Sequence, residues 1–131
     1  MAEVFSQPIV ITPADIDELG HVNNVVYLRW AQEIAIAHWQ ARAGADNVSA
    51  YVWVVTRHEI DYRNSLELGD DAEARTWVAP APVGATWGRH VEIGKRGADK
   101  PAARILSQWA MLDAATRRLK RVPPEIVSRF V

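Results

Sequence analysis

Two carboxylates, a glycine, a histidine and two asparagines lie together over residues 15–24, immediately before a long apolar segment. The string reads Asp-Ile-Asp-Glu-Leu-Gly-His-Val-Asn-Asn, and the spacing after it is typical of a helix. The start of a helix leaves backbone N–H groups unpaired and carries the positive end of the helix dipole. Beside a pocket, these groups can polarise a carbonyl and stabilise an oxyanion. A nearby carboxylate can activate water or attack directly, which makes an acyl-transfer site without serine or cysteine.

The same residue types also have ordinary structural uses. Asp, Asn and Gly before a helix commonly cap it, and a single histidine is more often structural than catalytic. His38 and His58 lack the spacing of a metal site, so we expect no metal and no cofactor. The sequence has no nucleophile elbow, phosphate-binding loop or dinucleotide-binding motif.

The elements that must position the segment follow from hydrophobic periodicity. A strand is expected over 5–11 and a helix over 22–43, closed by Gly44. The polar arc of this helix is narrow and is interrupted by Ile36, so the helix should be covered on several sides. Four further strands are expected over 51–63, 73–79, 85–95 and 102–112. The pattern predicts one α+β domain over residues 1–131, with a curved antiparallel sheet around one long central helix.

Composition narrows the class of protein. The chain has 131 residues, 15 Lys and Arg against 16 Asp and Glu, a net charge of −1 and no cysteine. Disulfides and zinc–thiolate sites are excluded, and the neutral balance gives no overall field for nucleic acid. No apolar run approaches the roughly 20 residues of a membrane span, and the start of the sequence lacks a basic leader. We therefore expect a cytoplasmic protein with no nucleic-acid or membrane partner.

The predicted sheet has open edges, and six tryptophans are many for this length. Edge pairing or face packing between subunits would cover such edges, so we expect a homodimer or homotetramer. Most of the tryptophans are expected in core or interface packing, although some can line an apolar tunnel. The tryptophans with these two possible uses are Trp30, Trp53, Trp77, Trp87 and Trp109.

Residues 15–24, followed by Tyr27 and Glu33, resemble hotdog-fold thioesterases of the 4-hydroxybenzoyl-CoA thioesterase type. Long-chain acyl-CoA thioesterases of bacteria and plant acyl-carrier-protein thioesterases carry a similar His-Val-Asn-Asn string. The resemblance continues at 60–63, 69–70 and 113–123 and covers nearly the whole chain. It implies a single hotdog domain that hydrolyses an acyl thioester, carried by CoA or by an acyl-carrier protein, to a free acid and a thiol.

The resemblance also assigns roles to residues. Asp17 matches the catalytic carboxylate, as nucleophile or general base, and Asn24 or a neighbouring N–H matches the group that polarises the thioester carbonyl. His21 and Asn23 match residues near the reaction centre. Tyr27 is expected in substrate binding, whereas Asp15 is expected to order the loop.

The sequence departs from the plant enzymes at two places. They have an asparagine where this chain has Leu19, and a glutamate where it has Asn64 and Ser65. The simplest mechanism therefore uses Asp17 with the helix N-terminus, and His21 serves equally well in a structural or positioning role.

CoA carries phosphates, so basic residues near the pocket mouth are expected. Arg63 is the first choice, because it lies beside Tyr62 on the strand predicted to face the helix start. Nine further basic residues are each expected on a solvated turn or strand face. They are Arg57, Arg89, Lys95, Arg96, Lys100, Arg117, Arg118, Lys120 and Arg121.

Two other functions remain compatible with this sequence. One is a non-catalytic module that binds acyl groups or acyl carriers, since a fold does not by itself carry activity. The other is a hotdog enoyl-thioester hydratase or dehydratase, but that chemistry needs a base at the α-carbon and fits the Asp17 motif less well.

Overall fold

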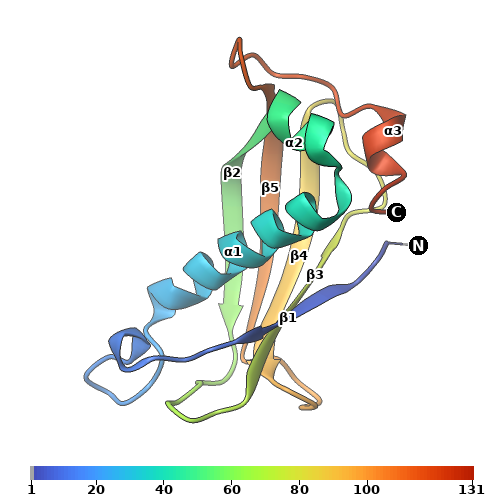
Figure 1. Cartoon of the computed structure of the whole chain (residues 1–131). Coiled ribbons are helices and arrows are strands. Elements are labelled where there is room, and N and C mark those ends of the chain that lie inside the picture. The colour runs from blue at the N-terminus through green and yellow to red at the C-terminus, as the bar shows by residue number, and fades with distance from the viewer. Residues whose placement is uncertain (1) are drawn as a thin grey trace.

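The computed structural model describes residues 2–131, in which one long helix crosses a five-stranded sheet (Figure 1). The strands are β1 (Phe5–Ile9), β2 (Tyr51–Tyr62), β3 (Ala72–Val78), β4 (Thr86–Lys95) and β5 (Ala103–Asp113). The long helix is α1 (Asn24–Arg42), and the short helical segments are a 3₁₀ turn (Pro13–Asp15), α2 (Ala45–Ala50) and α3 (Pro124–Val127).

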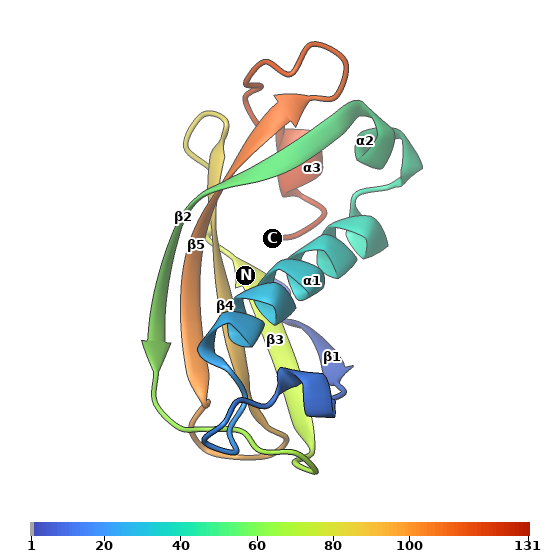
Figure 2. The same cartoon turned by 90° about the vertical axis from the view of Figure 1, so that its left-hand side faces the viewer.

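The sheet is antiparallel throughout, in the order β1-β3-β4-β5-β2. It curves around α1 (Figure 2), which confirms the predicted α+β architecture and the hotdog arrangement. Only β3–β4 and β4–β5 are hairpin neighbours. Within residues 2–131, strand β2 is an edge strand and pairs only with β5. The segment after β2 therefore runs across to β3, which lies next to the opposite edge of the sheet.

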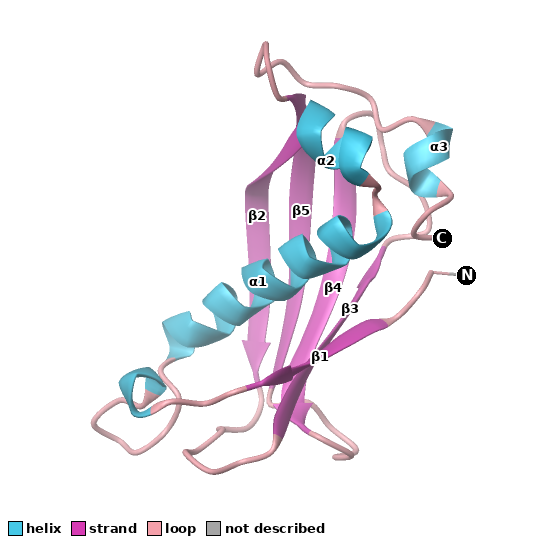
Figure 3. Ribbon diagram, viewed as in Figure 1, coloured by secondary structure: helices cyan, strands magenta, loops and turns pink. Residues whose placement is uncertain are grey.

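Most element boundaries lie within two residues of their predicted positions. The long helix begins at Asn24 rather than at residue 22, because Asn23 caps it. It ends as predicted, with Gly44 at φ 88°, a conformation that glycine adopts without strain. The short helical segments were not predicted, since a single turn shows no periodicity (Figure 3). Within residues 2–131, no helix is both long enough and apolar enough to cross a membrane.

Helix α1 packs against β1, β3 and β4 through one side. Its buried residues are Val26, Tyr27, Trp30, Ala31, Ile34, Ala35 and His38. Two apolar residues on other sides, Val25 and Ile36, are 67% and 49% exposed. The predicted cover on several sides is therefore only partly present in the single chain.

The core consists of two apolar clusters. One lies under the first half of α1 and includes Tyr27, Ile34 and Ile105. The other lies under the C-terminal end of α1 and includes Trp87 and Phe130. Five polar residues are buried, of which Asp15 lies in the loop before α1. The other four lie on α1 and the sheet; they are His38, Thr76, Arg89 and Ser107, and we call them the polar belt. The expectation of a solvated strand face is wrong for Arg89, which is only 8% exposed.

His38 joins the polar belt to the N-terminal segment. Its Nε2 lies 3.0 Å from Oε1 of Glu3, and its Nδ1 lies 2.9 Å from Nη1 of Arg89. Because Arg89 can only donate, Nδ1 must accept, and Nε2 then donates to Glu3. Burial, followed by the charge of Arg89, lowers the pKa of His38 to about 4. The imidazole is therefore neutral at pH 7, with its tautomer fixed by its two partners.

This lowered pKa makes stability depend on pH. An unfolded histidine takes up a proton near pH 6.5, whereas folded His38 does not until about pH 4. Acidification through this window therefore favours the unfolded state. The contribution of His38 to the free energy of unfolding falls by about 2 kcal/mol between pH 7 and pH 5. We expect the free energy of unfolding, measured with denaturant, to fall less between pH 7 and pH 5 for His38→Gln than for the wild type. His90→Gln, on the outer face of β4, should behave as the wild type, and equal losses in all three proteins would contradict the assignment.

Candidate functional site

A hollow of about 240 Å³ opens where α1 begins. Five of the six residues that the sequence predicted for the site line it: Asp17, His21, Asn23, Asn24 and Tyr27. Leu19, Val22, Tyr62, Asn64 and Ser65 complete the lining. The fold thus brings the loop before α1 together with the end of β2 and the segment that follows it.

Backbone hydrogen bonds shape the loop before α1 into a tight turn. Ile16 and Val22 form an antiparallel bridge, and the amide of Asp17 donates to the carbonyl of His21 at 2.9 Å. Gly20 has φ 81°, which allows its amide to donate back to the Asp17 carbonyl at 3.0 Å. The turn therefore holds the backbone of Asp17 in place beside the helix start.

The side chain of Asp17 is half-buried and fixed at one oxygen. Its Oδ1 accepts a hydrogen bond from the backbone amide of Leu19 at 2.9 Å. Its Oδ2 has no hydrogen-bond partner among residues 2–131. Where the plant enzymes place an asparagine, the backbone of Leu19 orients the carboxylate, and Oδ2 stays available to a ligand or a water molecule.

The two asparagines at the helix start have different roles. Asn23 is the cap, because its Oδ1 accepts from the amide of Val25 at 3.1 Å and its carbonyl accepts from Val26 at 2.9 Å. The amide of Asn24 has no acceptor in the described part of the chain. It is therefore an unpaired donor at the positive end of the helix dipole.

Asp15 orders the loop, as predicted. Its carboxylate is 2% exposed and accepts hydrogen bonds from the amide of Thr12 at 2.9 Å and from Arg29 at 2.9 Å. Burial raises the pKa of the Asp15 carboxyl, but these hydrogen bonds outweigh it and hold that pKa below its usual value. The ionised group ties the loop to the second turn of α1.

Two tyrosines join the helix start to the other wall of the hollow. The hydroxyl of Tyr27 accepts from the amide of Leu66 at 3.1 Å, and burial raises the pKa of Tyr27. The hydroxyl of Tyr62 donates to the carbonyl of Asn24 at 2.9 Å, and the two tyrosine rings meet edge to face. Both rings thereby brace the backbone that presents the Asn24 amide.

The remaining predicted residues lie nearer the surface. The Nε2 of His21 is 3.7 Å from Oε1 of Glu67. Arg63 follows Tyr62 directly but does not line the hollow, and its exposed guanidinium lies 3.9 Å from Asp61. Within residues 2–131, no three histidine, aspartate or glutamate side chains gather as a metal would require.

Sequence reasoning missed five lining residues, of which Leu19 and Val22 lie inside the motif itself. The other three, Tyr62, Asn64 and Ser65, lie more than thirty residues from the motif, and only the resemblance to the plant enzymes drew attention to Asn64 and Ser65. The usable signal was the position of Tyr62 at the end of a strand predicted to face the helix start.

The hollow combines two groups that acyl chemistry needs. The Asn24 amide can donate to an oxygen that gains negative charge, and Oδ2 of Asp17 can attack or can take a proton from water. The hollow is open to solvent and apolar in part, which suits the reaction of an extended substrate at its reactive carbon.

Comparison with known proteins shows similarity of fold to several thioesterases. A thioesterase from Thermus thermophilus, solved with coenzyme A and zinc, is 25% identical, with a TM-score of 0.81 over 95% of this chain and 90% of that one. A 1,4-dihydroxy-2-naphthoyl-CoA thioesterase from Synechocystis is 16% identical, with a TM-score of 0.77 over 94% and 92% of the two chains. At this low identity, the second comparison shows a shared fold alone.

A similar sequence is a chloroplastic acyl-[acyl-carrier-protein] hydrolase, FATB3, from Cuphea viscosissima. It is 31% identical over 80 residues, which are 61% of this chain. The match spans only 19% of the length of that relative. Residues 11–130 match the family model described as the thioesterase-like superfamily, and this chain belongs to that superfamily.

Proposed function

We propose that the protein hydrolyses an acyl thioester to a free carboxylic acid and a thiol. One observation carries this function: the Asp17 carboxylate and the unpaired amide of Asn24 line the same hollow. Membership of the thioesterase-like superfamily supports the reaction class. The His-Val-Asn-Asn string further supports a place beside the 4-hydroxybenzoyl-CoA thioesterase type.

The proposed reaction uses two groups of this chain. The thioester carbonyl oxygen accepts from the Asn24 amide, which stabilises the negative charge that forms as the carbonyl carbon is attacked. Either Oδ2 of Asp17 attacks that carbon, or it takes a proton from the water that attacks. In both routes the carbon–sulfur bond breaks and the thiolate leaves. Direct attack forms an anhydride with Asp17, which water then hydrolyses.

The carrier of the acyl group is proposed to be CoA or an acyl-carrier protein. The similar Thermus thermophilus thioesterase was solved with coenzyme A, and the Cuphea relative is named for an acyl-carrier-protein substrate. Arg63 adjoins the hollow through Tyr62, and its guanidinium is exposed at the surface. This position suits an ion pair with a phosphate of the carrier.

The first prediction that tests this function concerns the Asp17 carboxylate. We expect Asp17→Asn to fold normally, because the amide oxygen can still accept from Leu19, but to lower kcat about 100-fold or more. Thiol release from short, long and aromatic acyl-CoA esters measures the effect. Asp46→Asn, at the start of the distant helix α2, removes the same charge and should keep wild-type turnover. A folded Asp17→Asn protein with wild-type kcat would remove Asp17 from the mechanism.

The second prediction concerns the carrier. We expect Arg63→Ala to raise KM for an acyl-CoA severalfold with little change in kcat, because the pair with phosphate forms in the ground state. The same acyl group on N-acetylcysteamine, which lacks phosphates, should show no change in KM. Arg57→Ala, on the same strand, is the matched control. An unchanged KM for the CoA ester would exclude Arg63 from carrier binding.

The third prediction concerns assembly. We propose a homodimer or homotetramer, because β2 presents twelve residues whose outer edge is unpaired within residues 2–131. Exposed Val25, Ile36 and Val54 lie on α1 and on β2 itself. Light scattering after size exclusion at micromolar concentration should give two or four times the mass of one chain. A stable single-chain mass there would refute this assembly.

A further inference from the structure

A second cavity lies at the other end of α1 from the candidate site. It measures about 260 Å³ and is lined by residues of α1, α2 and all strands except β1, with Phe130 from the C-terminal segment. An apolar cavity of roughly 150 Å³ accommodates benzene, so this one has room for a one-ring molecule with a substituent. Its principal walls are Trp39, Trp53, Val78, Trp87, Trp109 and Phe130, and we call it the tryptophan pocket.

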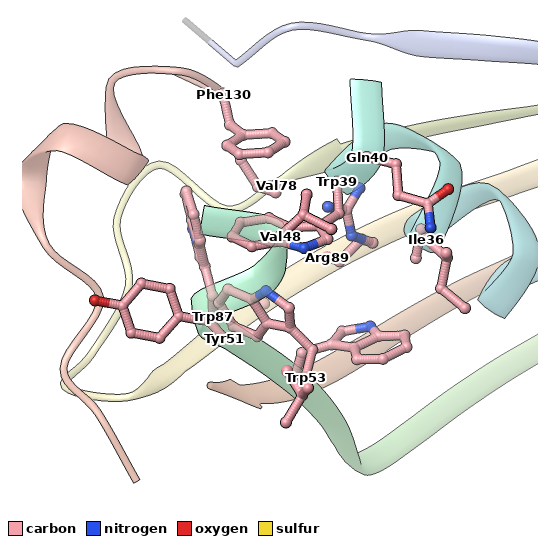
Figure 4. Close-up of a pocket in the computed structure, with 14 residues that line it drawn as sticks. Ile36, Trp39, Gln40, Val48, Tyr51, Trp53, Val78, Trp87, Arg89 and Phe130 are labelled. Atoms are coloured by element: carbon pink, nitrogen blue, oxygen red, sulfur yellow. The ribbon is translucent and has the colours of Figure 1, made fainter. Parts of the chain in front are cut away.

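One cation lies within these apolar walls. Arg89 lines the tryptophan pocket although its side chain is almost fully buried (Figure 4). The figure shows its guanidinium among the aromatic and aliphatic side chains of the wall. Burial lowers the pKa of Arg89 to about 10, so it remains charged at neutral pH. Arginine is rarely buried unless a carboxylate or another anion accompanies it.

The protein supplies Arg89 with neutral partners only. Nη1 donates to the hydroxyl of Thr76 at 3.0 Å and to Nδ1 of His38 at 2.9 Å. His38 is neutral, and the carboxylate of Glu3 lies beyond it, where it also pairs with Arg42 at 2.9 Å. Among residues 2–131, no carboxylate forms an ion pair with Arg89, and neither Nε nor Nη2 has a hydrogen-bond acceptor.

A second donor in the same wall also lacks an acceptor. The indole Nε1 of Trp53 is buried without a hydrogen-bond partner in the described part of the chain. Buried donors in native proteins are nearly always paired, because an unpaired one costs about 1–3 kcal/mol. The tryptophan pocket therefore contains a charged and a neutral donor with no acceptor to match them.

We propose that the tryptophan pocket binds a monocarboxylic acid with a small aromatic or aliphatic body, its carboxylate resting on Nε and Nη2 of Arg89. A carboxylate supplies the missing counter-ion and can accept both N–H bonds of the planar guanidinium in parallel. The tryptophan rings and Val78 cover the apolar body of the ligand. This binding does not depend on thioester hydrolysis, and it lies apart from Asp17 and Asn24 within the chain.

Two probes of nearly equal shape test the charge requirement. Phenylacetate and phenylacetamide differ in the carboxylate alone, and isothermal titration of the full chain at pH 7.5 measures both. We expect phenylacetate to bind at least about tenfold more tightly than the amide, because only the acid pairs with Arg89. Equal affinity for the two probes, or no saturable binding of phenylacetate at millimolar concentration, would overturn the proposal.

Variants locate the binding. Arg89→Met should bring the two affinities to within about twofold, whereas Arg75→Met, an exposed arginine on the neighbouring strand, should keep the wild-type preference. Retained preference in folded Arg89→Met would also overturn the proposal. If that variant does not fold, Ile36→Trp fills the cavity from an exposed position of α1 and should abolish binding. Binding of phenylacetate by Ile36→Trp at wild-type affinity would contradict this location.

A spectroscopic readout identifies the pocket independently of affinity. In a proton–nitrogen correlation spectrum, phenylacetate should shift the indole signals of Trp53 and Trp87, which line the pocket. Trp30 and Trp77 lie outside it and should not shift. Shifts confined to Trp30 and Trp77 would place the ligand elsewhere and refute the assignment.

Discussion

The burial of one helix on the concave face of one sheet is the constraint on which the rest of this structure depends. Helix α1 supplies much of the interior, from Val26 in its first turn to His38 one turn before its end. Because the helix is rigid and crosses the sheet, its two ends are fixed at opposite ends of the fold. The N-terminus presents the unpaired amide beside Asp17, and the C-terminal half forms a wall of the tryptophan pocket. Both candidate sites are therefore consequences of the same packing.

At the helix start, the residues that hold the structure together differ from the groups that are free to react. The structural groups all have hydrogen-bond partners. Asp15 pairs with Arg29, Asn23 caps the helix, and the Tyr27 hydroxyl accepts from the amide of Leu66. The groups suited to chemistry, Oδ2 of Asp17 and the amide of Asn24, are left without acceptors or donors among residues 2–131. An active site needs this division, because reacting groups that are held in place but unpaired require little reorganisation when a substrate binds.

In the polar belt, by contrast, a charged group is buried without a counter-ion from residues 2–131. A charged guanidinium in an apolar interior is costly, and replacing such groups with apolar residues often stabilises a protein. Here Arg89 is joined through neutral His38 to Glu3, which links the sheet interior to the N-terminal segment. The chain to Glu3 fixes the tautomer of His38 but brings no negative charge into contact with Arg89. The resulting imbalance of charge in a tryptophan-lined cavity is the physical basis for expecting an anionic ligand.

The sequence by itself determined the local elements and the chemistry-bearing segment. Periodicity located the strands and α1 to within a few residues, and the residue types over 15–24 indicated a carboxylate beside a helix start, because caps, turns and amphipathic faces are set by neighbours in the chain. Tertiary structure alone decided which strands pair, since β2 joins β5 across a crossover that no local pattern encodes. It alone brought Tyr62 to Asn24 and buried Arg89, whose strand position is equally compatible with a solvated face. Such outcomes depend on which distant surfaces meet, and a one-residue shift of register would have turned Arg89 to solvent.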